Sequence, residues 1–181
     1  AKPVRFGYAQ SMRPPLLRML LPIALTLTAC GSDEDTPAAP DVLEELEEPG
    51  PHAVGFRTYT VKYAAPPDNM EREVYVLAWY PAEQAEGDRP LYVVKSSEVA
   101  VKDAPPKDLG KLPTVVFSHG HQGYAAVLSH FMEHAASHGF LAIAPTHTGN
   151  TFANGDSRTT DIFHLRAKDV SETLTFFEDL S

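Results

Sequence analysis

Two short, continuously apolar segments restrict the fold of this chain more than any other feature. Residues 114–117 read Thr-Val-Val-Phe, and residues 140–144 read Phe-Leu-Ala-Ile-Ala. Strands that are buried on both faces have this composition, and such strands belong to parallel sheets covered by helices. Residues 124–138, between them, have apolar side chains at helical spacing and stop before Gly139. The order strand, helix, strand predicts a parallel pair joined by a crossover helix. The side chains expected to pack on the sheet are Leu128, Phe131, Met132, Ala135 and Ala136.

The neighbouring segments extend this unit. Residues 56–63 and 73–80 alternate apolar and polar side chains, and the segment between them contains two adjacent prolines. This pattern predicts an antiparallel hairpin with one solvated face, whose second strand ends at Pro81. In the charged segment 82–112, only residues 91–95 suggest a strand, and residues 161–180 have helical periodicity. The predicted fold is α/β, with an antiparallel opening hairpin followed by the start of a mostly parallel sheet with flanking helices.

The first 53 residues differ from the rest in charge and composition. Residues 1–29 contain four Lys or Arg and no acid, and residues 19–29 are apolar but too short to span a bilayer, which needs about 20 apolar residues. Residues 12–29 are therefore interpreted as a secretory signal peptide, and residues 1–11 as upstream translation. Residues 30–53 are acidic and Pro-rich, which predicts a tether. We expect the folded domain to occupy residues 54–181.

The end of the apolar run resembles the lipobox of bacterial lipoproteins. It reads Leu27-Thr28-Ala29-Cys30, and Cys30 is the only cysteine. The resemblance implies that Cys30 is acylated, which anchors a secreted protein to a membrane of the bacterial cell envelope. The alternative is a plain cleaved signal peptide followed by an incidental cysteine.

Charge also limits the possible partners. From Cys30 onward the chain has 11 basic and 24 acidic residues, a net charge of −13 (11 − 24). A protein that acidic repels phosphate backbones, so nucleic acid is not an expected partner.

A glycine-containing loop, residues 118–123, follows the first apolar strand and reads Ser-His-Gly-His-Gln-Gly. In open α/β sheets, ligands bind beyond the carboxyl ends of strands, and glycines let main-chain N–H groups approach a developing negative charge. The loop lacks the first glycine of a dinucleotide-binding fingerprint and the Lys-Ser/Thr of a Walker loop. We therefore expect no nucleotide and no other cofactor.

Residues 114–120, 136–140 and 142–149 together resemble bacterial α/β-hydrolases related to platelet-activating-factor acetylhydrolase, dienelactone hydrolase and polyester hydrolases. Residues 166–170 resemble the helix that precedes the nucleophile strand in these enzymes, and residues 54–81 resemble their opening hairpin. The likeness covers residues 54–181. It implies an ester hydrolase that acts on small-molecule or lipid substrates, namely short acyl esters with phospholipid-like and polyester subclasses.

The resemblance also implies roles for residues of the loop. The main-chain N–H of His121 is expected to be one donor of an oxyanion hole, with Gly120 and Gln122 beside it in the loop. We expect His119, Tyr124 and His147 to line a substrate crevice, although a surface-loop histidine is an equally good interpretation of His147.

The nucleophile of such a hydrolase lies in a Gly-x-Ser-x-Gly pentapeptide, followed in sequence by the acid and then the histidine. No such pentapeptide occurs in the chain, since residues 155–159 fail at the last position. Ser118 is the first residue of the loop, before its His-Gly pair, and is not taken as the nucleophile. All three triad members are therefore expected beyond Ser181, which predicts that this chain alone is inactive.

Two other functions remain open. One is a non-catalytic, lipid-anchored binding module on the same fold. The other is a zinc peptidase, because His130, Glu133 and His134 match a His-x-x-Glu-His pattern. At about 100° per residue, however, the histidines of this helix point away from the face expected to pack on the sheet, which favours a solvated row. A separate pair, Arg166 and Asp169, is predicted to form a local ion pair because the two residues are three apart on a helix.

Overall fold

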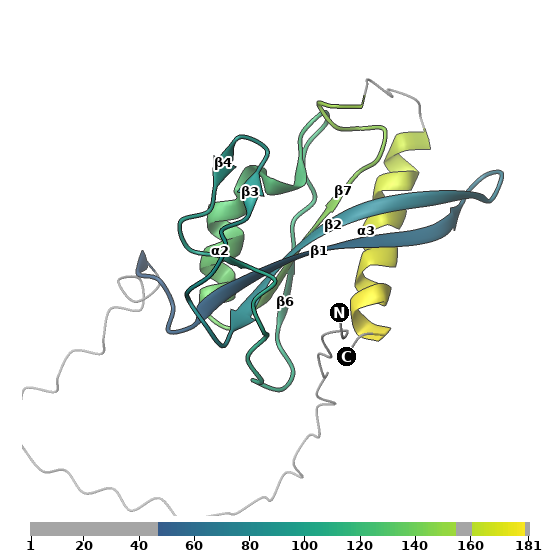
Figure 1. Cartoon of the computed structure of the whole chain (residues 1–181). Coiled ribbons are helices and arrows are strands. Elements are labelled where there is room, and N and C mark those ends of the chain that lie inside the picture. Colours follow the sequence, from purple (N-terminus) through teal and green to yellow (C-terminus); the bar gives the residue numbers. More distant parts are fainter. Residues whose placement is uncertain (1–46, 155–160, 180–181) are drawn as a thin grey trace, which may run out of the picture. The chain divides into compact units, whose positions relative to one another are not determined.

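The computed structural model describes residues 47–154 and 161–179, and the described residues from Pro49 onward belong to one compact unit (Figure 1). The predicted signal peptide, Cys30 and most of the predicted tether lie outside the described residues. No helix in the described ranges has both the length and the hydrophobicity needed to cross a membrane.

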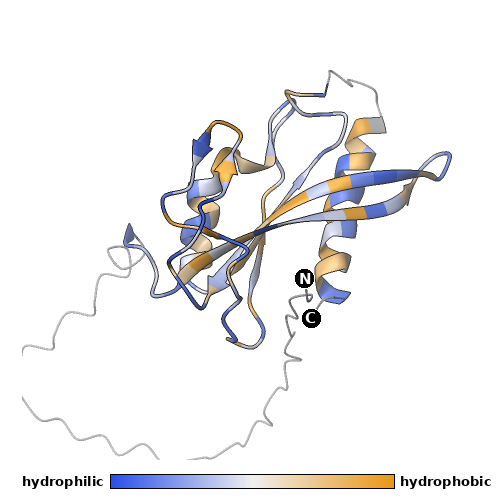
Figure 2. Cartoon of the chain, in the orientation of Figure 1, coloured by the Kyte–Doolittle hydropathy of each residue, from blue (hydrophilic) through white to orange (hydrophobic). Residues whose placement is uncertain are grey.

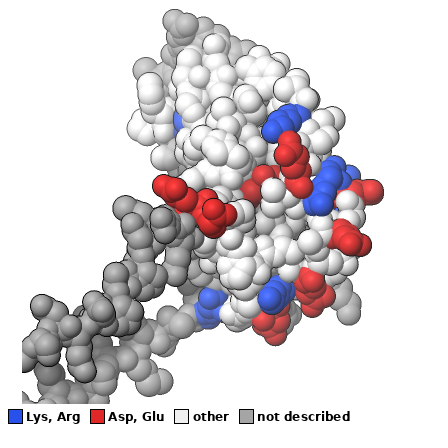
Figure 3. Space-filling model, turned by 90° about the vertical axis from the view of Figure 1, so that its left-hand side faces the viewer, with Lys and Arg blue, Asp and Glu red and all other residues white. Residues whose placement is uncertain are grey.

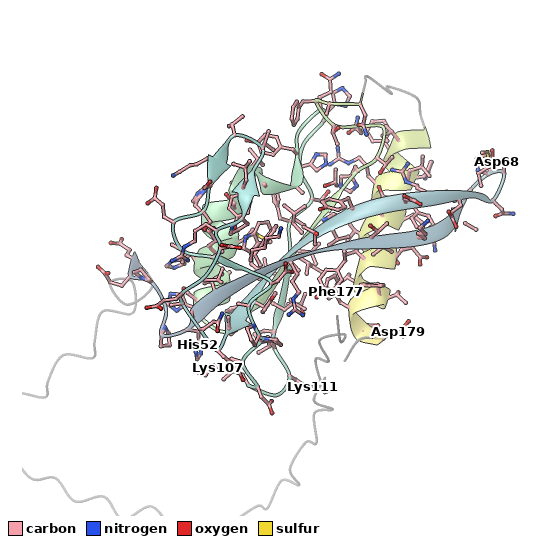
Figure 4. All side chains as sticks on the ribbon, in the orientation of Figure 1. His52, Asp68, Lys107, Lys111, Phe177 and Asp179 are labelled. Carbon is pink, nitrogen blue, oxygen red and sulfur yellow. The ribbon has the colours of Figure 1, made fainter. Side chains whose placement is uncertain are left out.

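The predicted hairpin is confirmed and is longer than expected, but the predicted solvated face is wrong for much of it, because residues 76–82 are buried on both faces. Strands β1 (Ala53–Ala65) and β2 (Met70–Ala82) pair antiparallel over their full lengths, and Asp68 lies at the tip of the hairpin (Figure 4). Pro81 does not end β2, contrary to the prediction, because a proline near a strand end needs only its carbonyl for pairing. That carbonyl accepts a hydrogen bond of 2.9 Å from the main-chain N–H of Lys107.

The predicted strand-helix-strand unit is also confirmed. Strand β6 (Thr114–Val116) is followed by the 3₁₀ helix η1 (Ala125–Leu128), helix α2 (Ser129–Ser137) and strand β7 (Leu141–Thr146), and β6 and β7 are parallel. Gly139 has φ +95°, a left-handed conformation that favours glycine where a helix stops. The chain therefore turns from α2 directly into β7.

The main sheet has the order β5-β1-β2-β7-β6, which includes a short strand β5 (Val101–Lys102) that sequence patterns did not indicate. Strand β7 is buried on both faces, as expected. Strand β6 is only half-buried, because it lies at the edge of the sheet formed by the described residues. The strand suggested at residues 91–95 is instead a small hairpin, in which β3 (Leu91–Tyr92) pairs with β4 (Lys95–Ser96).

Helices cover both faces of the sheet, which confirms the predicted α/β class (Figure 1). Alternate residues of β1 and β2 pack with helix α3 (Asp161–Asp179) on one face, and Phe177 points from α3 toward the strands (Figure 4). The other residues of the same strands pack with α2, around the fully buried Trp79 and Met132. This alternation of faces along a strand is the reason one hairpin serves two cores.

Phe131 corrects the predicted packing face of α2. Its side chain is 50% exposed, whereas Met132, Ala135 and Ala136 are buried as predicted. Leu128, the first residue of the predicted face, ends the 3₁₀ helix with φ −107° and ψ 30°. It therefore does not share the helical geometry of α2, and a face counted from it is displaced.

Glu133 lies on the buried side of α2. Its Oε1 accepts hydrogen bonds from Tyr92 Oη at 2.7 Å and from Ser97 Oγ at 2.6 Å. Tyr92 Oη in turn accepts a bond of 2.7 Å from Trp79 Nε1. This network attaches the β3–β4 hairpin to α2 and β2, because each of its buried polar groups depends on the next.

We predict that Glu133→Ala lowers the free energy of unfolding by about 1 to 3 kcal/mol, because it leaves two buried hydroxyl groups without their acceptor. Urea denaturation measures the change. The matched control is Glu98→Ala, which removes only the exposed ion pair with Lys95 and should cost less than about 1 kcal/mol. Equal effects of the two substitutions would contradict the network.

Candidate functional site

The loops that follow β6 and β7 lie side by side at the carboxyl ends of these parallel strands (Figure 1). An isolated parallel bridge joins Gly123 to Thr151, and the main-chain N–H of Phe152 lies 3.4 Å from the carbonyl oxygen of Gly123. We call residues 118–123 the His-Gly loop and residues 147–154 the β7 loop. Their contact places the predicted chemistry-bearing segment beside a second loop at the edge of the sheet where α/β proteins bind ligands.

The backbone of the His-Gly loop turns tightly. The N–H of Gly123 donates to the carbonyl of Gly120 at 3.0 Å, and Gln122 has φ +53°. A Cβ atom added at Gly123 would lie 3.1 Å from that carbonyl oxygen and 3.2 Å from the His119 ring. The close approach accounts for the glycine at this position.

His119 is a buried support of the loop. Its Nε2 accepts the main-chain N–H of His147 at 3.1 Å, so the proton of the neutral ring lies on Nδ1, which donates to the carbonyl of Gly120 at 2.8 Å. Burial lowers the pKa of this histidine, which favours the neutral form. The side chain is fully enclosed, so the prediction that His119 lines a crevice is wrong.

His147 connects a serine to a carboxylate. Its Nδ1 lies 2.9 Å from Asp169 Oδ2, and its Nε2 lies 2.8 Å from Ser118 Oγ. The carboxylate accepts only, so Nδ1 carries the proton and, in the neutral ring, Nε2 accepts from the serine hydroxyl. The ring is fully buried, whereas Ser118 is exposed. Both expectations for His147, a crevice and a surface loop, are therefore wrong.

Asp169 receives four donors. Oδ1 accepts from Tyr63 Oη at 2.8 Å and Arg72 Nε at 2.8 Å, while Oδ2 accepts from Arg72 Nη2 at 2.9 Å in addition to His147. Burial alone would raise the pKa of this carboxyl, but the hydrogen bonds from Arg72, His147 and Tyr63 outweigh it and hold the pKa below its usual value. The group therefore remains a carboxylate in the core.

Arg166 corrects the prediction of a local ion pair with Asp169. Its Nη1 donates to Asn150 Oδ1 at 3.0 Å, and its Nη2 donates to the carbonyl oxygen of His119. Asn150 Nδ2 in turn lies 2.8 Å from His121 Nδ1. The two residues of α3 therefore hold the loops separately, since Asp169 reaches the β7 loop through His147 while Arg166 bridges the β7 loop and the His-Gly loop.

Two further predicted residues have clear places in the structure. Tyr124 is partly buried, and its ring packs on Phe152 with the ring centroids 5.4 Å apart. His121 is exposed in the loop beside Gly120 and Gln122, and its role as a main-chain oxyanion donor stays a prediction.

The zinc alternative conflicts with the structure. Glu133 is directed into the core by its bonds to Tyr92 and Ser97, whereas His130 is exposed. Within the two described ranges, no group of three His, Cys, Asp or Glu residues could hold a metal ion. On the face shown in Figure 3, basic and acidic side chains are interspersed, and no basic stripe for a nucleic acid is visible there.

The sequence did carry a signal for Asp169. The side chains of Ile162, Asp169, Thr173 and Phe177 form one buried row of α3, with spacings of seven, four and four residues. An aspartate on the apolar stripe of a helix requires donors from elsewhere in the fold. Its partners could not be predicted, because Arg72 lies 97 positions away in the sequence.

Comparisons with known proteins agree with this geometry. A family model described as chlorophyllase matches residues 72–171, which include both loops and most of α3. A solved structure of a ferulic acid esterase from Streptomyces cinnamoneus is similar with a TM-score of 0.58 and 25% sequence identity, over 71% of this chain and 48% of that one. The chain thus spans about half the length of that esterase. A search of curated proteins found no match. The mixed sheet and this likeness show an α/β-hydrolase fold.

We predict that Asp169→Asn lowers the free energy of unfolding at neutral pH by about 3 to 5 kcal/mol, because Arg72 loses its buried partner. The folded pKa of Asp169 lies below the unfolded value, so its stabilisation is present above the usual Asp pKa of about 3.9 and is lost as pH falls through the folded value. Urea denaturation between pH 7 and pH 3 should show the gap between wild type and variant shrinking below about pH 4. A gap that is constant over this range would contradict the assignment.

Proposed function

Because the chain belongs to the chlorophyllase family, we propose that the protein is a carboxylic ester hydrolase that transfers the acyl group of its substrate to a serine. The observation that carries the proposal is the His-Gly loop, which lies at the carboxyl end of β6 and is held there by Arg166 and His147. The α/β-hydrolase fold and the likeness to a ferulic acid esterase support the same reaction class. We place short acyl esters, including phospholipid-like ones, first among its substrates.

The proposed role of the loop is to stabilise the oxyanion of the acyl-transfer transition state. The main-chain N–H of His121 would donate to the developing negative charge, and the second donor would come from the residue after the nucleophile. Removal of one such donor typically costs about 100- to 1000-fold in kcat. The N–H group that makes such a contribution must be fixed in its orientation. The contacts of Arg166 and Asn150 with this loop do so, because they tie it to α3 and to the β7 loop.

We propose that the nucleophile follows residue 181. The printed sequence contains no Gly-x-Ser-x-Gly, and the chain matches 48% of the esterase to which it is similar. In this assignment, ester hydrolysis requires the part of the protein that carries the nucleophile, so residues 1–181 alone are inactive.

A rival assignment places the nucleophile at Ser118, since a serine, a histidine and a buried carboxylate within hydrogen-bond distance form a triad geometry. The full burial of His147 argues against it, because the base must later deliver its proton to the leaving group of the substrate. Ser118 is also the first residue of the His-Gly loop and not the central serine of a Gly-x-Ser-x-Gly turn. We therefore assign Ser118, His147 and Asp169 as positioning residues.

A fluorophosphonate probe separates the two assignments, because it forms a covalent bond with an activated serine. We expect residues 1–181 to remain unlabelled and a protein extended downstream to be labelled at a serine beyond residue 181, as mapped by peptide mass spectrometry. Ser118→Ala in the extended protein should retain the label.

Labelling at Ser118 would overturn the positioning assignment and make the Ser118–His147–Asp169 geometry a working triad. An extended protein without label and without hydrolysis of p-nitrophenyl butyrate would contradict the esterase and favour a non-catalytic binding module on the same fold.

We further propose that the protein is a lipid-anchored protein of the bacterial cell envelope. The support is the sequence Leu27-Thr28-Ala29-Cys30 after an apolar run, which lies outside the described residues. Expression in a bacterial host fed with radiolabelled palmitate should label the wild type, and Cys30→Ser should remove the label and release the protein from the membrane fraction. An unlabelled wild type, or a labelled variant, would contradict the anchor.

A further inference from the structure

An apolar cavity adjoins the His-Gly loop, and the function proposed above assigns it no role. Its volume is about 480 Å³, and it lies between β1 and β2, the β3–β4 hairpin, η1 and the β7 loop. This volume falls within the range of about 300 to 1,000 Å³ that is typical of small-molecule sites.

Aromatic rings dominate the walls of the cavity. They come from five separate segments and belong to Phe56, Tyr75, Tyr92, Tyr124 and Phe152. Lys102 is the only charged residue among those that line it. Faces and edges of aromatic rings pack well against another ring, which favours a flat, apolar ligand.

The mouth of the cavity exposes an unusual amount of apolar surface. Four of its lining residues are among the most exposed large hydrophobic side chains of the described chain, with exposures of 49% for Tyr75, 68% for Leu91, 50% for Val93 and 58% for Phe152. Figure 2 shows the hydrophobic character of β3 and of the turn that follows it. A contiguous apolar surface around a cavity marks a binding site better than scattered apolar residues do.

Parts of the wall are fixed before any ligand arrives. Tyr92 is bonded to Trp79 and Glu133, and the rings of Phe56 and Tyr92 pack edge to face with centroids 5.3 Å apart. Since the rings are already ordered, a ligand loses less free energy in immobilising them.

The cavity begins where the His-Gly loop ends. Tyr124 follows Gly123 directly and lines the cavity, and a bridge joins Gly123 to Thr151, which also lines the cavity. A group bound in the cavity would therefore lie next to the segment that carries the proposed oxyanion donor.

We infer that this cavity binds the apolar part of the ester substrate, specifically an alcohol group that carries an aromatic ring. The claim that the ligand is a substrate rests on the proposed esterase function. The ring stacks among the aromatic walls, and the ester group extends from it toward the His-Gly loop.

Fluorescence titration with N-phenyl-1-naphthylamine, an uncharged aromatic probe, tests the cavity without any catalytic step. We expect one saturable site per chain. Phe152→Ala should weaken binding about fivefold to tenfold, because loss of one aromatic partner costs about 1 to 1.4 kcal/mol. Thr58→Trp, at an exposed lining position of β1, should fill the cavity from the sheet side and abolish the saturable binding.

The matched control is Phe163→Ala, which removes a 75% exposed phenylalanine of α3 that does not line the cavity. It should leave the affinity unchanged. Unchanged binding by Phe152→Ala and Thr58→Trp, or an equal loss in Phe163→Ala, would overturn the cavity as a ligand site.

The substrate role is tested in the extended protein that carries the nucleophile. There, Phe152→Ala should raise KM for 2-naphthyl esters and leave KM for ethyl acetate unchanged. Equal changes in KM for both esters would overturn the substrate role. Saturable probe binding in a protein that hydrolyses no ester would instead contradict the esterase proposal and support the cavity as a ligand site. Failure of the esterase proposal can therefore be distinguished from failure of the cavity.

Discussion

The buried carboxylate of Asp169 is the interaction on which the rest of the site depends. A charge in the core is tolerated only when it is paired and fully hydrogen-bonded, and this one receives Tyr63 from β1, Arg72 from β2 and His147 from the β7 loop. One side chain of α3 thus joins that helix to both strands of the opening hairpin and to the loop after β7. The helix cannot shift by one turn without stranding a charge, which fixes its register on the sheet.

The same helix controls the His-Gly loop through a second side chain, Arg166, one turn before Asp169. The two contacts differ in kind. Asp169 acts through a buried histidine ring, whereas Arg166 bonds the main chain of the loop itself. An oxyanion donor must point at its target with little freedom, and a loop of glycines does not provide that rigidity alone. The proposed chemistry and the proposed apolar cavity therefore share one support.

Local patterns predicted the secondary structure well because they depend on nearest neighbours. The alternation predicted a strand, and buried and exposed residues do alternate in β1 from Thr60 to Ala65. The apolar run at residues 140–144 follows from a strand covered on both sides. Errors in predicted burial arose in helix α2. Phe131 was misplaced because the predicted face was counted from Leu128, which lies outside α2. The burial of Glu133 was not predicted, because the hydroxyl groups that bond it come from Tyr92 and Ser97, far away in the sequence.

The sequence by itself determined the class of the fold, the order of its elements and the position of the His-Gly loop at a strand end, because hydrophobic periodicity and glycine placement act over a few residues. Only the tertiary structure decided the partners of the polar side chains. Arg72 and Asp169 are 97 positions apart, and Ser118 and His147 are 29 apart, so no local spacing relates them. A charged residue on the apolar face of a helix indicates that it needs hydrogen-bond partners, but the packing of the helix on the sheet determines which residues these are.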